Sequence, residues 1–106
     1  MIELTAGDFG EKIYFEIYDK DDNPVDLTGA EITFFWRKIT ATTWNKGDGA
    51  IESALEGLCS YTTEADDFDE AGQFIGAIRT EWTGIKRKTY SNRKITVSEE
   101  PIETPN

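Results

Sequence analysis

The sequence predicts an all-β fold, an antiparallel β-sandwich of seven to eight short strands, on three observations. Apolar residues alternate with polar ones over several short stretches, and turn-forming residues separate these stretches at regular spacing. No stretch has the apolar period of a long helix. A small closed barrel is the main alternative for the same strand count. The 106 residues suffice for one domain, which we expect over residues 1–98, with a flexible tail over residues 99–106.

The strongest apolar alternation lies in residues 31–38, where Ile32, Phe34 and Trp36 are predicted to face the core. The residues between them are predicted to face outward, because successive side chains of a strand point to opposite sides. The other strands are expected at Ile2 with Leu4, and at residues 13–17, 50–55, 58–62, 74–82, 86–90 and 94–97, with a break near residues 91 and 92.

Residues 23–30 form a turn-rich loop before strand 31–38. Pro24 fixes its own φ and holds the preceding residue extended. Asp26 can accept hydrogen bonds from amides two or three residues on, and Gly29 can adopt a positive φ. Leu27 is the apolar residue positioned to plug the core beneath the loop. We therefore expect the rest of the chain to pack around this loop and the strand that follows it.

Two other connections carry specific expectations. Residues 40–49 are predicted to be a loop with an isolated Trp44, which could be a recognition residue or a lid on the core, the lid being favoured. Residues 63–68 are predicted to form one helical turn, with Thr63 as its N-cap and Asp66 in the place of the usual glutamate.

Composition narrows the classes of function. Eleven basic and 21 acidic residues give a net charge of −10, which argues against nucleic acid or an anionic membrane as partner. The chain lacks histidine and a phosphate-binding glycine loop, so we expect no His-dependent catalytic triad, no metal and no cofactor. The single cysteine, Cys59, is predicted to be a small core residue. The sequence shows neither a signal peptide nor an apolar run of transmembrane length.

Two acidic clusters are candidate sites. Asp19, Asp21 and Asn23 alternate as at the start of an EF-hand loop, but Pro24 and Ala30 stand where that loop needs glycine and glutamate. A solvated hairpin tip is the expected structure, with a weak calcium site as the alternative. Residues 64–70 hold five carboxylates, and a pair of carboxylates at a suitable separation could catalyse glycoside hydrolysis. A solvated helical turn is the simpler interpretation of this second cluster.

Strand parity divides the remaining aromatic and aliphatic residues between the faces. If Ile13, Phe15 and Ile17 face the core, Tyr14 and Tyr18 face outward on one sheet. By the same rule Phe35 and Ile75 share the outer face of the other sheet. Apolar groups on an outer sheet face are interface candidates, although scattered surface aromatics are also common. The predicted interface residues are Tyr14, Tyr18, Phe35 and Ile75.

Several segments carry a resemblance to a known family. Residues 24–30 read Pro-Val-Asp-Leu-Thr-Gly-Ala, and residues 70–74 contain an acidic-x-Gly-x-aromatic pattern ending at Phe74. With these runs, the chain resembles over nearly its whole length the immunoglobulin-like N-terminal domain of phage baseplate upper proteins. Phe74 lacks the hydroxyl of the tyrosine corner found in many immunoglobulin-like domains. The other matching segments are residues 6–8, 19–23, 32–36, 57–62, 64–66 and 95–97.

The resemblance implies an immunoglobulin-like sandwich that is a non-catalytic structural component of a phage or prophage tail or baseplate. Such a component would act in virion assembly through protein–protein contacts. Its partners would be other tail or baseplate proteins or further copies of the chain, in the virion and, during assembly, in the host cytoplasm. The alternative hypothesis is a carbohydrate- or cell-surface-binding module that uses Trp44 and the acidic loop tips, with or without calcium.

Overall fold

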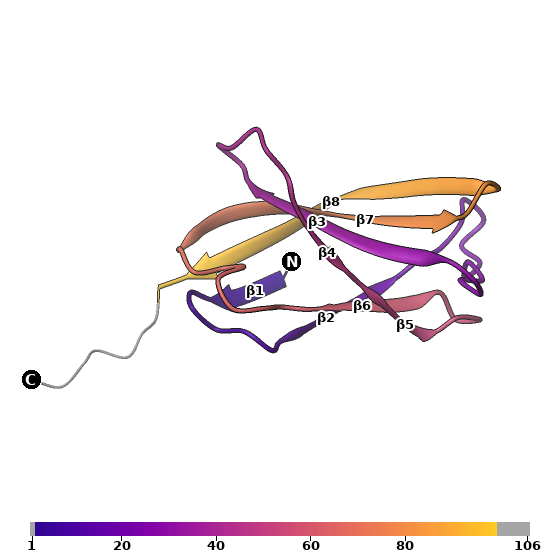
Figure 1. The fold of residues 1–106 in the computed structure, drawn as a ribbon, viewed down its shortest axis with the longest axis horizontal. Helices are drawn as coiled ribbons and strands as arrows, with labels where there is room; N and C mark the ends of the chain where they lie inside the picture. The colour runs from indigo at the N-terminus through magenta and orange to yellow at the C-terminus, as the bar shows by residue number, and fades with distance from the viewer. Residues whose placement is uncertain (1, 100–106) are drawn as a thin grey trace, which may run out of the picture.

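The computed structural model describes residues 2–99, apart from the side chains of residues 91–93, and shows two β-sheets packed face to face (Figure 1). The strands pair antiparallel except β1 and β8, which are parallel. The predicted all-β, sandwich-like fold is therefore confirmed, in place of a closed barrel. The larger sheet has the order β1 (Ile2–Thr5), β8 (Lys86–Ser98), β7 (Gly72–Trp82), β3 (Glu31–Lys38), β4 (Asn45–Asp48); the smaller has the order β2 (Lys12–Glu16), β6 (Leu58–Thr62), β5 (Ala50–Ser53).

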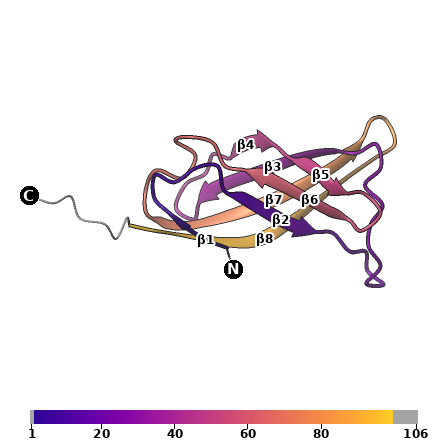
Figure 2. The ribbon, with the colours of Figure 1, turned by 90° about the horizontal axis from the view of Figure 1, so that it is seen from below.

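The core lies between the sheets and is centred on β3. Ile32, Phe34 and Trp36 are buried, as predicted. The ring centroid of Phe34 lies 5.4 Å from that of Phe15 and 4.9 Å from that of Tyr61, so it joins the two sheets. Figure 2 shows the smaller sheet lying across the larger one. The other large buried residues, including the predicted Cys59, are Ile13, Ile17, Leu27, Cys59, Phe68, Phe74, Ile78, Ile95 and Val97.

The loop of residues 23–30 has the predicted structure. One carboxylate oxygen of Asp26 accepts hydrogen bonds from the amide (2.9 Å) and the hydroxyl (2.6 Å) of Thr28. Gly29 has a φ of 79°, which L-residues rarely adopt. Leu27 is fully buried, and its amide donates to the carbonyl of Ala54 at 2.9 Å. The loop therefore attaches the start of β3 to the smaller sheet.

The loop predicted for residues 40–49 is shorter than expected. Residues 45–48 form β4, which pairs with β3, and the chain passes through Gly49 into β5 of the other sheet (Figure 1). A Cβ at Gly49 would lie 2.6 Å from Ile32 Cγ2 and 2.8 Å from the carbonyl oxygen of Ser60. Only glycine allows the chain to cross between the sheets so closely. Hydrophobic periodicity did not indicate β4, because its sequence Asn-Lys-Gly-Asp contains no large apolar residue.

The helical turn predicted for residues 63–68 is wrong. This connection is a non-helical turn, in which the amide of Asp67 donates to the carbonyl of Glu64 at 3.1 Å. The Thr63 hydroxyl is no N-cap, because it accepts a hydrogen bond from the amide of Glu11 at 3.1 Å. Bonding to a distant connection replaced the local helix that the capping pattern suggested.

The end of the chain also departs from the prediction. β8 runs without a break from Lys86 to Ser98, and the irregularity expected near residues 91 and 92 is a register shift opposite Gly76 and Ile78 of β7. A bulge of this kind keeps a strand paired while it bends. Of the tail predicted for residues 99–106, all but Glu99 lies outside the described residues.

Neighbouring phenylalanines on β3 test the assignment of its two faces. Phe34→Ala should cost about 3–5 kcal/mol of unfolding free energy, because it empties the centre of the core. Phe35→Ala should cost about 1–2 kcal/mol, because Phe35 is half-buried on the outer face. Urea denaturation followed by circular dichroism measures both. Equal losses would contradict the assignment.

Candidate functional site

The structure places the four predicted interface residues on two different surfaces. Tyr14 is 56% exposed on β2 of the smaller sheet. Tyr18 follows β2, is also exposed, and its hydroxyl donates to the Glu16 carboxylate at 2.6 Å. Phe35 and Ile75 lie together on the outer face of the larger sheet, both half-buried. The surface around Phe35 and Ile75 carries more candidate contact residues than the surface around the two tyrosines.

Cations surround Phe35 and Ile75 on the outer face of the larger sheet. In the strand register, Phe35 lies between Lys46 on β4 and Ala77 on β7, and Ile75 lies between Arg37 on β3 and Lys94 on β8. The guanidinium carbon of Arg79 lies 4.9 Å from the centroid of the Phe35 ring. We call this surface the cationic face and define it by Phe35, Arg37, Trp44, Lys46, Ile75, Arg79 and Lys94.

Arg37 organises the edge of the cationic face. Its Nη1 donates to the carbonyls of Lys38 and Ile39, both at 3.2 Å, and of Ala41 at 2.7 Å. Its guanidinium carbon also lies 4.9 Å from the centroid of the Trp44 ring. Trp44 is 42% exposed, so the favoured prediction of a core lid is wrong. The guanidinium therefore holds the β3–β4 hairpin and presents Trp44 on the surface.

Ile39 extends the apolar part of this face. Its amide donates to the carbonyl of Gln73 at 3.1 Å, so the pairing with β7 continues one step beyond β3. Ile39 is 55% exposed and has the same strand parity as Phe35 and Arg37. The alternation in the sequence could have identified Ile39. Nothing in the sequence indicated the two cation–π contacts of this face, because one joins β3 to its hairpin loop and the other joins β7 to β3.

Charge is segregated within the chain. The five strands of the larger sheet carry nine of the 11 basic residues and only four of the 21 acidic residues. The rest of the chain therefore holds two basic and 17 acidic residues. The nine basic residues are Arg37, Lys38, Lys46, Arg79, Lys86, Arg87, Lys88, Arg93 and Lys94.

The opposite charge gathers where the β1–β2 and β6–β7 connections meet, residues 6–11 and 63–71. Backbone hydrogen bonds join these connections: Gly7 to the carbonyl of Phe68 at 2.9 Å, and Gly10 to that of Thr63 at 2.8 Å. Neither connection contains a basic residue. Phe9 is 64% exposed among the carboxylates. We call this surface the acidic end and define it by Asp8, Phe9, Glu11, Glu64, Asp66 and Asp69, all exposed.

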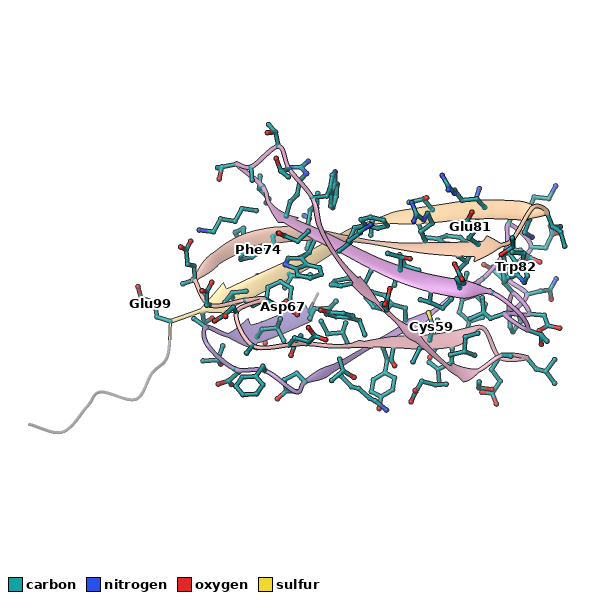
Figure 3. All side chains as sticks on the ribbon, viewed as in Figure 1. Cys59, Asp67, Phe74, Glu81, Trp82 and Glu99 are labelled. Atoms are coloured by element: carbon teal, nitrogen blue, oxygen red, sulfur yellow. The ribbon has the colours of Figure 1, made fainter. Side chains whose placement is uncertain are left out.

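Asp67 stabilises the acidic end from within. Its Oδ2 accepts hydrogen bonds from the Tyr61 hydroxyl at 2.5 Å and from the amide of Glu64 at 2.7 Å. Its carbonyl accepts from the Trp36 indole at 3.3 Å. Figure 3 shows Asp67 at the same end of the molecule as Glu99, away from Trp82. Burial and the hydrogen bond to Asp67 raise the pKa of the Tyr61 phenol well above its ordinary value.

An open cleft of about 370 Å³ lies beside this turn. Its carboxylates come from the predicted acidic cluster, and Lys38 pairs with one of them, Glu70, at 2.5 Å. This hydrogen bond and charge hold the pKa of Glu70 below its ordinary value. Asp67 is engaged as described above. The remaining residues of the cleft are Trp36, Ala41, Thr43, Asn45, Asp66, Asp69 and Phe74.

The acidic cluster of residues 19–23, the candidate calcium site, gives the calcium hypothesis no support. At the 19–23 loop tip, one Asp19 oxygen accepts hydrogen bonds from the amides of Asp21 (2.8 Å) and Asn23 (3.0 Å), so the carboxylate closes its own turn. Among residues 2–99 as described, no three His, Cys, Asp or Glu side chains are grouped so as to hold a metal ion. The same residues include no helix that is long and apolar enough to cross a membrane.

Comparison of the sequence with known families and curated proteins found no match. The chain matches no protein-family model, and no curated protein matches its sequence. A functional argument for this chain therefore depends on its fold and on the chemistry of its surfaces.

Tyr61 should make stability depend on pH in alkaline solution. Its pKa is raised in the folded state, so the native protein keeps a proton that the unfolded chain loses above about pH 10. Stability should therefore fall as pH rises beyond that point, by about 1.4 kcal/mol per pH unit for this group. Tyr61→Phe should make the fall shallower and cost about 1–2 kcal/mol at neutral pH. Urea unfolding from about pH 8 to pH 11.5 measures both slopes, and parallel curves would show that Tyr61 is not responsible.

Arg37→Lys should loosen the β3–β4 hairpin, because an ammonium cannot reproduce the guanidinium contacts with three carbonyls and an indole. We expect amide hydrogen exchange over residues 39–45 to accelerate about tenfold, with little change in β6 or β8. Mass spectrometry of peptic fragments measures this exchange. Lys46→Ala, which removes a cation from the same face, is the control and should leave the hairpin protected. Equal exchange in both variants would show that Arg37 does not organise the hairpin.

Proposed function

We propose that this chain is an immunoglobulin-like domain and a non-catalytic structural component of a phage or prophage tail or baseplate. Its role is virion assembly through protein–protein contacts. The single observation that carries the assembly role is the cationic face, where half-buried Phe35 and Ile75 and exposed Trp44 lie among arginines and lysines of an otherwise acidic chain.

Strand order supports the immunoglobulin-like part of the proposal. In such domains strands B, E and D form one sheet, and G, F, C and C′ form the other. The order β2-β6-β5 corresponds to B-E-D, and β8-β7-β3-β4 corresponds to G-F-C-C′. β1 then replaces the first strand and pairs in parallel with β8. Phe74 lies near the start of β7, the strand that corresponds to F.

Surface composition supports the assembly role. Aromatic residues and arginine are enriched in protein–protein interfaces, and arginine and tryptophan are frequent among the residues that contribute most binding energy. Both cation–π contacts of the cationic face are preformed in the single chain, so little side-chain freedom remains to be lost on binding. An open sheet face of this kind suits contact with another folded protein better than enclosure of a small ligand.

The most specific part of the family resemblance has a structural explanation. Within residues 24–30, Leu27 fills the core, Asp26 closes the turn and Gly29 supplies the positive φ. The run therefore supports the fold that the resemblance implies. These three residues are not part of the cationic face. The assembly role is therefore supported by the surface of the larger sheet and not by this run.

The alternative function, a carbohydrate- or cell-surface-binding module, has one favourable observation. Trp44 is exposed, and its neighbours Thr43 and Asn45 line the cleft that also holds Asp66 and Asp69. Sugar sites combine an aromatic platform with polar groups that bind hydroxyls. Most of the exposed apolar surface around Phe35 and Ile75 would have no role in this alternative, so we favour assembly.

The test is whether the chain is a part of virions. Tailed particles should be induced from a host that encodes the chain, purified on a density gradient, and analysed by quantitative mass spectrometry. We expect the chain in these particles at a fixed ratio to other tail proteins. Deletion of its coding sequence should leave heads without complete tails in electron micrographs. Its absence from intact particles, together with quenching of tryptophan fluorescence by a glycan, would overturn the proposal in favour of the alternative.

A further inference from the structure

The molecule carries two exposed surfaces of opposite charge, each with aromatic rings. The cationic face presents Arg37 and Arg79, stacked on Trp44 and Phe35, on the side of the larger sheet that faces away from the smaller sheet. The acidic end presents Phe9 among five exposed carboxylates where the β1–β2 and β6–β7 connections meet. Both surfaces face solvent, and their charges are complementary.

We propose that the cationic face of one copy binds the acidic end of a second copy. The carboxylates would pair with the arginines and lysines, and Phe9 would supply an aromatic anchor against the apolar centre formed by Phe35 and Ile75. This inference deepens the proposed function, on which it rests, by naming the partner and both contacting surfaces.

The second copy is the partner that the surfaces favour. Its acidic end carries negative charge opposite to that of the cationic face, and both its carboxylates and Phe9 are exposed for contact. Nucleic acid would also be attracted by the basic residues, but the net charge of −10 opposes its approach. The same net charge opposes two copies at long range. At physiological ionic strength this repulsion is screened beyond about 8 Å, whereas pairs in direct contact are screened much less.

The two surfaces differ, so the contact is head-to-tail and cannot form a closed symmetric dimer by itself. A heterologous contact forms a ring if its rotation closes and a filament if it does not. The cationic face points sideways from the larger sheet, whereas the acidic end lies at the end of the sandwich where β1 ends and β7 begins (Figure 1). Successive copies must therefore be turned relative to each other, as in the rings or helical layers of a tail.

Complementary variants test the contact. The face variant, I75S/K94E, keeps its acidic end, and the end variant, F9S/D69K, keeps its cationic face. Each should be monomeric alone, because every copy lacks the same surface. Mixed together, they should form a 1:1 heterodimer that cannot grow, since one intact surface of each kind remains. Light scattering behind a sizing column at about 0.15 M salt and up to about 1 mM protein measures the masses.

The matched control is L55S/K20E, which also removes one exposed apolar side chain and reverses one charge, but on neither surface. The control should assemble like the wild type. Self-association of each surface variant should be at least tenfold weaker than that of the wild type. Circular dichroism and urea midpoints verify folding. If I75S/K94E is unfolded, K46E/K94E replaces it, because both lysines are exposed on the strands.

Three outcomes would overturn the inference: a wild-type chain that is monomeric at every concentration, an assembling wild type whose variants do not combine when mixed, or a control that loses assembly. Failure of the proposed function is a separate result. A chain found in virions but monomeric in solution would overturn this inference alone. A chain that forms the 1:1 heterodimer but is absent from virions would overturn the proposed function alone.

Discussion

The packing of Phe34 against Phe15 and Tyr61 is the contact on which the two-sheet arrangement depends. It lies on β3, the one strand whose inner side chains form the middle of the core and whose outer side chains form the middle of the cationic face. Because successive side chains of a strand alternate, burial of Phe34 directs its neighbours Phe35 and Arg37 outward. A one-residue slip of β3 would therefore exchange core and surface together.

The acidic end depends on the same core through a different set of contacts. Tyr61, which packs against Phe34, donates its hydroxyl to Asp67, and Asp67 in turn accepts the amide of Glu64. One carboxylate thus binds the hydroxyl of buried Tyr61 and a turn amide, while the exposed carboxylates of the connection face solvent. The five carboxylates of residues 64–70 therefore have different roles in the fold. Asp67 is structural, whereas Glu64, Asp66 and Asp69 are on the surface.

Segregation of charge links the fold to the proposed assembly role. A net charge of −10 favours solubility. Most of the basic residues nevertheless lie on the larger sheet. There Arg37 and Arg79 each stack on an aromatic ring, and Arg37 also donates to backbone carbonyls, which limits the entropy lost when a partner binds. A surface that is ordered, part apolar and opposite in sign to the rest of the chain has the properties of an interface.

Local patterns in the sequence determined most of the strands (though not β4), the buried face of β3, the burial of Cys59 and the geometry of the 24–30 loop, because period-two alternation and turn chemistry act over a few residues. The same parity placed Phe35 and Ile75 on one face. Tertiary structure decided the crossing at Gly49, the non-helical turn at Asp67, the stacking of Arg37 on Trp44, and the meeting of the 6–11 and 63–71 connections. Each of these depends on hydrogen bonds or side-chain contacts between separate elements, which local preference does not encode.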